Sequence, residues 1–108
     1  MKKDRFYITK REKRCSGKIY VEQVDGYTDI IETSDGNTIP IGIYKTDNVY
    51  AAVEISTGIQ FATSHCNYNL CLANAKFYAD MIYALINRDD ELIAESKQLI
   101  NKANGRLF

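Results

Sequence analysis

The sequence predicts an α+β fold: an antiparallel meander sheet of five or six strands, followed by one or two C-terminal helices packed on one face. Over the first two thirds of the chain, turn chemistry separates short segments rich in Ile, Val, Tyr and Thr. From Asn69 to Ala103 there is no Gly or Pro, and apolar residues recur at helical spacing. A chain of 108 residues is long enough for one domain and too short for two.

We therefore expect a single domain over residues 1–108. Residues 1–17 are expected to form a basic arm or an edge strand, residues 18–66 the sheet, and residues 69–104 the helical part. The strands are expected near 18–24, 27–33, 38–45, 49–56 and 59–65, with a sixth near 5–10. Four residue pairs with turn chemistry separate them: Asp25-Gly26, Asp35-Gly36, Asp47-Asn48 and Thr57-Gly58. Short connections make consecutive strands antiparallel neighbours.

Alternation of apolar residues assigns the faces of the last three strands. Three runs show this alternation at every second position: Ile39, Ile41 and Ile43; Val49, Ala51, Val53 and Ile55; and Ile59 and Phe61, continued by Thr63. A period of two indicates one buried and one open face, and we assign all three runs to the buried face. Pro40 cannot donate to a ladder, which predicts an edge position or a bulge there.

The opposite face carries Tyr44 and Tyr50 among small residues. Because one layer of helices covers only one face of a sheet, we expect this Tyr-bearing face to be open. Tyr is common at protein interfaces, since it buries apolar area and keeps a polar group, although it also suits a hydrated sheet face. Tyr20, on an earlier strand, is a further candidate contact.

The helical part shows one apolar stripe with a candidate break. Its first members are Leu70, Ala73, Phe77, Met81 and Leu85, widened by Tyr78 and Ile82, and its later members are Leu92, Ser96, Leu99 and Ala103, beside Ile93 and Ile100. Asn69 is predicted to be the N-cap, and Asn104-Gly105 the C-terminal stop. The acidic pair Asp89-Asp90 favours a second helix start, whereas the stripe continues through it without a slip. A single helix of ~35 residues would be ~50 Å long, so we favour two helices and leave one open as the alternative.

Residues with reactive or metal-binding chemistry are few. His65, Cys66, Cys71 and Cys15 have the residue types of a zinc site. No C-x2-C pair is present, however, and neighbours on a strand point to opposite faces. Phosphate-binding glycine motifs are absent as well. We predict no metal, no cofactor and no catalytic residue, with Cys71 as a small core residue; the protein is not expected to be an enzyme.

Charge is distributed unevenly along the chain. Residues 1–18 hold eight of the fourteen basic residues against Asp4 and Glu12, and the remainder holds six basic and twelve acidic residues. Basic residues interleaved with Phe6 and Tyr7 suit nucleic acid or an acidic protein surface, and also suit an edge strand guarded by Lys. The candidate contact residues are Arg5, Lys10, Arg11, Lys13 and Arg14.

The expected setting is the cytoplasm. Three cysteines at positions 15, 66 and 71 do not form a disulfide framework, which favours a reducing compartment. No apolar run approaches the ~18 residues of a membrane span, so no membrane partner is expected.

One pattern resembles a known group of proteins. The segment from Val49 to Ile59, with its Thr57-Gly58 turn, followed by a strand and an Asn- and Ala-rich helix from Leu70, is similar to small accessory proteins of phages and mobile elements over about residues 49–86. The resemblance implies a non-enzymatic protein that binds host machinery, as inhibitors of RNA-guided nucleases (anti-CRISPR proteins) do. No residue role is transferred, because that group has no shared site.

These observations predict a small interaction protein that binds and inhibits or modulates a host protein complex, or that self-associates through the Tyr-bearing face. The alternative is a nucleic-acid-binding module led by the basic N-terminal segment.

Overall fold

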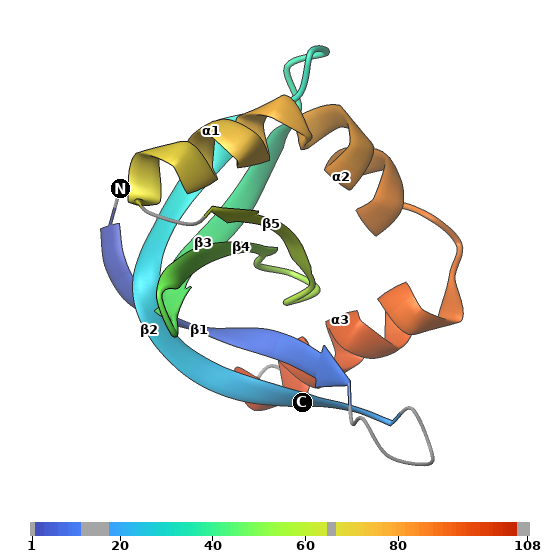
Figure 1. Ribbon diagram of the computed structural model, residues 1–108. Helices are drawn as coiled ribbons and strands as arrows, with labels where there is room; N and C mark the ends of the chain where they lie inside the picture. The colour runs from blue at the N-terminus through green and yellow to red at the C-terminus, as the bar shows by residue number, and fades with distance from the viewer. Residues whose placement is uncertain (1, 12–17, 65–66, 106–108) are drawn as a thin grey trace.

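The computed structural model describes residues 2–11, 18–64 and 67–105, and it confirms the α+β class (Figure 1). Five antiparallel strands follow one another in chain order and pair in the same order, β1-β2-β3-β4-β5. Their bounds are β1 Lys2–Arg11, β2 Ile19–Glu32, β3 Thr38–Thr46, β4 Val49–Glu54 and β5 Gln60–Ser64. The helices that follow are α1 Tyr68–Phe77, α2 Ala79–Ile86 and α3 Glu91–Ala103.

The basic N-terminal segment is an edge strand over Lys2–Arg11, so the edge-strand alternative holds for these residues. Pro40, by contrast, does not mark an edge, because β3 lies between β2 and β4. Paired residues of β3 and β4 begin at Ile41, opposite Glu54, and the Pro40 carbonyl accepts a hydrogen bond from the Ile55 N–H. The missing N–H of Pro40 therefore falls at the end of this ladder, where it removes little pairing.

Three of the four predicted turns are confirmed, and the fourth is wrong. Gly36, Asp47 and Gly58 have positive φ angles of 85°, 52° and 66° at the turns after β2, β3 and β4. Asp25-Gly26, however, lies inside β2, which runs without interruption for 14 residues. The predicted strands 18–24 and 27–33 are one strand, which bends strongly along its length (Figure 1).

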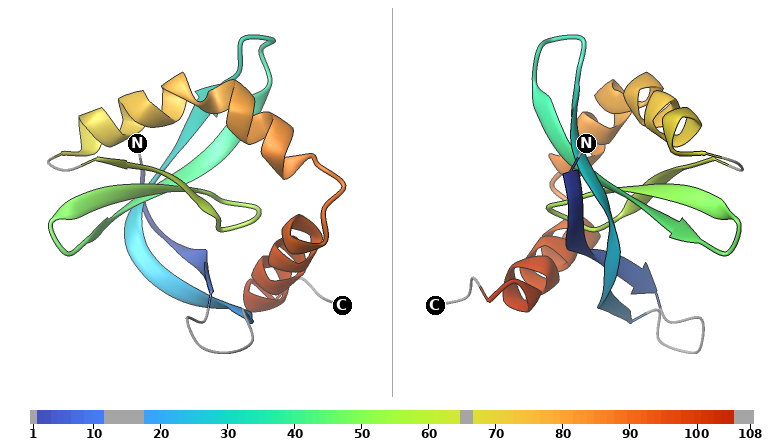
Figure 2. Two further views of the ribbon diagram at one scale, coloured as in Figure 1. Left: turned by 45° about the vertical axis from the view of Figure 1, so that its right-hand side comes forward. Right: turned by 90° about the vertical axis from the view of Figure 1, so that its left-hand side faces the viewer.

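Two glycines create the space for this bend. A Cβ at Gly26 would lie 2.3 Å from the Ile43 carbonyl oxygen, and one at Gly42 would lie 2.6 Å from the Phe6 ring. The ring of Phe6 therefore packs directly on the backbone of β3. The sheet is strongly coiled (Figure 2). Phe6 and Ile8 of β1 therefore pack on residues of β3 and β4, on the face of the sheet that a flat sheet would leave uncovered.

One core cluster joins the sheet to α1 and α2. Its sheet side is Ile31, Ile39, Ile41, Ile43 and Ala52, and its helix side is Cys71, Ala75, Ala79 and Ile82. The face assignment of β4 was wrong, because the register pairs Ile43 with Ala52 and Tyr44 with Ala51. Tyr50 and Ala52 therefore share the face of the isoleucines, and Ala51 and Val53 lie on the other face.

A second core cluster occupies that other face. It consists of Phe6, Ile8, Tyr44, Ala51 and Val53, flanked by Val24 and Ile55. The expectation of one fully open face is therefore wrong, since both faces contribute to the core. α3 packs against β1 and β2 rather than alongside α1, and it buries Ile93, Ser96 and Ile100.

The helical part contains the predicted break and one more. α2 ends at Ile86 and α3 begins at Glu91, with Asp90 as its N-cap through a 2.8 Å hydrogen bond to the Leu92 N–H. α1 and α2 meet at Tyr78, where the helical hydrogen bonds continue on both sides, so this second interruption is a kink. The N-cap of α1 is Asn67 rather than Asn69, and α3 stops at Asn104 and Gly105 as predicted.

The apolar stripe of α1 and α2 was centred on the wrong side, although Ile82, predicted at its margin, is buried. The buried positions are Cys71, Ala75, Ala79 and Ile82, which we call the inner stripe. Leu70, Phe77 and Met81, predicted as core, are 49%, 81% and 56% exposed. Among the residues described, no helix has the length and hydropathy that crossing a membrane requires.

Candidate protein-binding surfaces

The tyrosines predicted as contacts do not form one surface. Tyr44 is only 8% exposed and packs edge-to-face on Phe6, with ring centroids 6.2 Å apart. Burial raises the pKa of the Tyr44 phenol. Tyr50 lies on the opposite face, half-buried against the cluster under α1, with the Lys45 ammonium 5.9 Å from its ring centre. Tyr20 is 45% exposed on β2, opposite Lys10 in the strand register.

The basic residues of β1 are partly neutralised by acids on β2. The Arg5 Nε lies 3.0 Å from the Asp25 carboxylate, and the Lys10 Nζ lies 3.2 Å from that of Glu22. The hydrogen bond to Glu22 raises the pKa of Lys10. Arg11 is exposed, whereas Lys13 and Arg14 lie outside the described residues. The described part of the N-terminal segment is therefore less strongly cationic than its sequence indicates.

Of the residues with metal-binding chemistry, only Cys71 can be placed. Cys15, His65 and Cys66 lie outside the described residues, and the described ranges contain no group of side chains able to hold a metal ion. Cys71 is fully buried in the core under α1, as predicted. Burial raises the pKa of its thiol to about 11, which suppresses the reactive thiolate.

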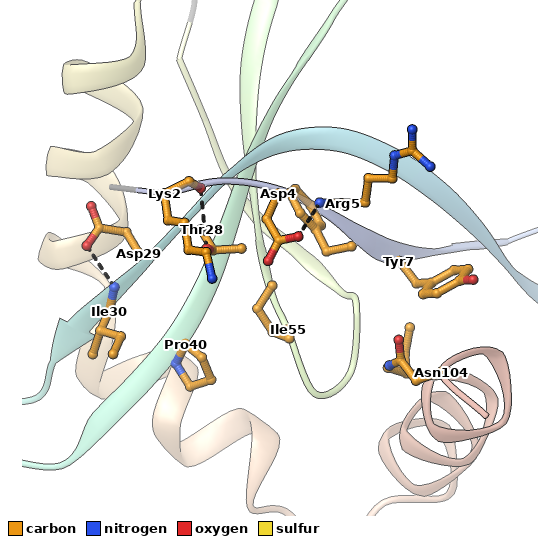
Figure 3. A pocket seen from close by; sticks show the side chains of 12 residues that line it. Lys2, Asp4, Arg5, Tyr7, Thr28, Asp29, Ile30, Pro40, Ile55 and Asn104 are labelled. Carbon is orange, nitrogen blue, oxygen red and sulfur yellow. Dashed lines mark hydrogen bonds between the residues drawn. The ribbon is translucent and has the colours of Figure 1, made fainter. Parts of the chain in front are cut away.

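A cleft of about 540 Å³ lies on the face of the sheet opposite α1 and α2. We call it the seam cleft. Its lining comes from β1, β2, β3, the turn after β4 and the end of α3: Lys2, Asp4, Arg5, Phe6, Tyr7, Thr28, Asp29, Ile30, Pro40, Ile55, Ile100 and Asn104. Figure 3 shows Lys2, Asp4 and Thr28 on one side, with Pro40 and Ile55 across from them. Ile30 is 62% exposed, so part of the apolar lining meets solvent. The volume falls in the range of about 300–1,000 Å³ that is typical of ligand sites.

The cleft begins where the sheet comes close to closing on itself. The Thr9 N–H donates to the Gly58 carbonyl at 2.8 Å, and the Thr9 hydroxyl donates to the Thr57 carbonyl at 2.6 Å. These bonds join the outer edge of β1 to the turn after β4, and we call this contact the seam. Further along β1, towards Lys2, the two walls separate and enclose the cleft.

A buried carboxylate shapes the turn that forms the seam. Glu54 is 1% exposed, and it accepts hydrogen bonds from the Ser56 N–H, the Ser56 hydroxyl and the Thr57 N–H at 2.8–2.9 Å. Three donors compensate the cost of burying this charge. The turn is thereby held in the shape that places Gly58 against Thr9.

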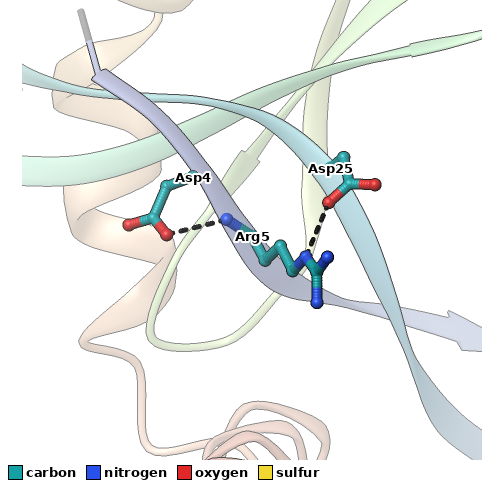
Figure 4. Close-up of polar contacts among 3 residues, drawn as sticks. All are labelled: Asp4, Arg5 and Asp25. Atoms are coloured by element: carbon teal, nitrogen blue, oxygen red, sulfur yellow. Dashed lines mark hydrogen bonds and ion pairs between the residues drawn. The ribbon is translucent and has the colours of Figure 1, made fainter.

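The free edge of β1 carries its own polar caps (Figure 4). The Asp4 carboxylate accepts a 2.8 Å hydrogen bond from the Arg5 N–H, and the Arg5 side chain reaches across to Asp25. Such local caps and charges protect an edge strand from unwanted pairing.

A second candidate surface lies on the outside of α1 and α2. It consists of Leu70, Phe77, Tyr78 and Met81, which we call the outer stripe, and each of these side chains is at least 41% exposed. Leu70, Phe77 and Met81 are spaced by seven and four residues and so share one side of the helix pair. Phe77 and Tyr78 also pack edge-to-face, with centroids 5.0 Å apart. The sequence contains this stripe, but periodicity alone does not say whether an apolar stripe faces in or out.

Sequence reasoning missed most of the seam cleft. Ile30, Ile55 and Asn104 come from segments far apart in the chain, and they meet only because the sheet coils. The available signal was the pair Ile30-Ile31, because neighbouring residues on a strand point to opposite faces, so one of these isoleucines lies on the second face of the sheet. Comparison of the chain with family models, curated proteins and solved structures finds no match.

Proposed function

We propose that this protein is a small, non-enzymatic interaction protein that binds a protein partner through the outer stripe. One observation carries the proposal: α1 and α2 are already anchored on the sheet by the inner stripe, yet they present Phe77 at 81% and Met81 at 56% exposure on the outside. Neither side chain belongs to the core cluster under the helices. Contiguous exposed apolar patches on soluble proteins mark interaction sites more often than scattered ones do.

The energetic argument concerns water. Full burial of a large apolar side chain yields about 1.5–3 kcal/mol, so covering Phe77, Met81 and Leu70 offers several kcal/mol to association. Aromatic side chains such as Phe77 and Tyr78 are typical anchors of interfaces, because they bury much area at a low cost in conformational entropy. A partner with an apolar groove or helix face of matching length fits this surface.

The finer parts of the proposal rest on the sequence. The resemblance of residues 49–86 to phage and mobile-element accessory proteins extends it to a protein that inhibits or modulates a host complex, in the manner of anti-CRISPR proteins. We place its action in the cytoplasm, a setting in keeping with the free, buried thiol of Cys71. Self-association through the outer stripe is a second form of the same proposal.

The test compares a stripe variant with a matched surface variant. We expect Phe77→Ser/Met81→Ser to fold like the wild type, because both side chains are more than half exposed. It should lose partner capture or self-association, measured by affinity capture and by light scattering over a range of concentrations. Lys76→Ser, an exposed position on the same helix, should retain both.

Two outcomes count against the proposal. In the first, the wild-type protein stays monomeric, and the stripe variant captures every protein that the wild type captures. The other is binding to oligonucleotides whose affinity falls steeply with salt, which would favour the nucleic-acid alternative. The cross-strand pairs Arg5–Asp25 and Lys10–Glu22 do not support that alternative, because they offset part of the basic charge.

A further inference from the structure

Within the part of the chain that the structure describes, the outer edge of β1 is a pairing surface that is only partly used. In an antiparallel strand, backbone groups point alternately towards and away from the neighbouring strand. Thr9 points away from β2, since its N–H bonds to Gly58 across the seam. Lys3, Arg5 and Tyr7 share this parity, so their N–H and C=O groups also point outward.

β1 ends the strand order, so no strand of the described chain pairs with this edge. The Arg5 N–H is satisfied instead by the Asp4 carboxylate, a cap that can swing aside into water because Asp4 is exposed. The edge is therefore covered at Thr9 by the seam and at Arg5 by a side chain.

The seam cleft lies along this same edge. Five residues of β1 line it: Lys2 and the run from Asp4 to Tyr7. Thr28 and Ile30 of the adjacent strand lie beside them, and Ile55, Ile100 and Asn104 complete the walls. A backbone entering the cleft would meet outward-pointing hydrogen-bonding groups on one side and apolar side chains below. These two features together are what strand addition to a sheet edge requires.

The charges around the cleft distinguish between occupants. Its charged lining residues are two basic, Lys2 and Arg5, and two acidic, Asp4 and Asp29, and Arg5 is also paired with Asp25. A polyanion such as nucleic acid gains no net attraction from such a set. A segment of low charge with apolar side chains on alternate residues matches both the lining and the pairing edge.

We propose that the seam cleft is a β-augmentation site, in which an extended peptide segment of a partner protein pairs with the outer edge of β1 from Lys3 to Tyr7. Its carbonyl groups replace the Asp4 carboxylate at the Arg5 N–H, and every second side chain packs on Phe6, Pro40 and Ile55. The site goes beyond the proposed function, because it lies on the face of the sheet opposite α1 and α2.

The test uses proline as a probe of the edge. Arg5→Pro removes an N–H that points away from β2. The hydrogen bonds between β1 and β2 keep all their donors, so the strand should still form. Arg5→Ala is the matched control, because it loses the same Asp25 ion pair and keeps the N–H. The ligand probes are fluorescein-labelled octapeptides in which Val, Ile or Phe alternates with Thr or Ser, and peptides of the same composition with the apolar residues grouped together.

We expect the wild type and Arg5→Ala to bind an alternating peptide with similar affinity by fluorescence anisotropy, and Arg5→Pro to bind at least about tenfold more weakly. Grouped peptides should bind more weakly than alternating ones. In amide NMR spectra of the wild type, the peptide should shift the signals of Lys3, Arg5 and Tyr7, a measurement that stands even if Arg5→Pro does not fold. Phe77→Ser/Met81→Ser should bind the peptide normally, which separates this site from the outer stripe.

The proposal is overturned if no alternating peptide binds the wild type, or if Arg5→Pro binds as well as Arg5→Ala. It is also overturned if the edge pairs with a second copy of the chain. In that case the wild type and Arg5→Ala would be dimers, and Arg5→Pro would be a monomer. Preferential binding of a thymidine oligonucleotide that competes with the peptide would likewise reject it.

Discussion

At the scale of single residues, Tyr68 has the most strongly raised pKa of the tyrosines that the structure describes. Its hydroxyl donates to the Asp29 carboxylate at 3.3 Å, and its ring packs edge-to-face on Tyr27, with centroids 5.7 Å apart. Burial, and then the negative charge of Asp29, raises the pKa of Tyr68 to about 12. Both effects disfavour the phenolate, so Tyr68 ties α1 to β2 only while it is protonated.

This perturbation predicts a loss of stability at alkaline pH. The phenol of the unfolded chain loses its proton near pH 10, whereas that of the folded chain keeps it until about pH 12. The contribution of Tyr68 to stability is therefore fully present below pH 10, and it declines as the pH rises towards 12. Absorbance of tyrosinate at 295 nm should therefore include a tyrosine that ionises near pH 12, and Tyr68→Phe should remove that step while the raised pKa of Tyr44 remains. The free energy of unfolding of Tyr68→Phe should depend less on pH over this interval than that of the wild type; equal slopes would contradict the assignment.

The predicted contact residues show what one sequence leaves undetermined at this scale. Alternation correctly separated Tyr44 from Ile43, but it did not reveal that Phe6, distant in the chain, covers Tyr44. Cys71 was placed correctly, because cysteine is among the residue types most often buried, whereas Ala73, also predicted to lie in the core stripe, is exposed. A contact between distant segments, such as the Glu54 turn with Thr9, leaves no mark in local composition.

At the scale of elements, the glycines of β2 and β3 determine the bend of the sheet. Replacing Gly26 by Ala would place a Cβ 2.3 Å from the Ile43 carbonyl oxygen, and a backbone atom cannot move aside as a side chain can. We expect Gly26→Ala to lower the free energy of unfolding by about 1–3 kcal/mol, the range seen for overpacked sites. Urea denaturation followed by circular dichroism measures the difference.

The neighbouring Asp25→Ala serves as its control. It removes an ion pair between side chains that are 72% and 77% exposed, so its effect on the stability should be small. A Gly26→Ala variant as stable as Asp25→Ala would show that the strand relieves the contact at little cost.

The same dipeptide explains why element boundaries were only partly predictable. Asp35-Gly36 forms a turn with a φ of 85° at the glycine, whereas Asp25-Gly26 lies within a strand. The local chemistry is identical, and only the packing of Phe6 and Ile43 on Gly26 distinguishes them. The types of the elements and their order followed from periodicity. The choice between the inner and outer stripes depended on which of them packs closely on the isoleucine face of the sheet.

At the scale of the whole molecule, the coiled sheet builds a core on each of its faces, and Cys71 reports on one of them. Its thiol is fully buried and its pKa is raised to about 11, so inaccessibility and the scarcity of thiolate both protect it from reaction. In the variant Cys15→Ser/Cys66→Ser it is the only thiol of the chain. Labelling by iodoacetamide at neutral pH should then require unfolding of α1 from the sheet.

We expect the labelling rate to rise with urea along the same transition as the circular dichroism signal. Denatured protein provides the control for full reactivity. Rapid labelling of the native variant would show that α1 detaches from the sheet independently of the rest of the fold.

The kinked helix pair of α1 and α2 has a consequence for how such a protein diversifies. Its inner stripe is made largely of Cys and Ala, which fix the spacing between helix and sheet and leave little room for change. Its outer stripe lies a few residues away on the same backbone, and its side chains are largely exposed. If the outer stripe is the recognition surface that we propose, mutations that change its partner meet little opposition from selection for a stable fold, and a lineage can exchange one target for another while the sheet stays as it is.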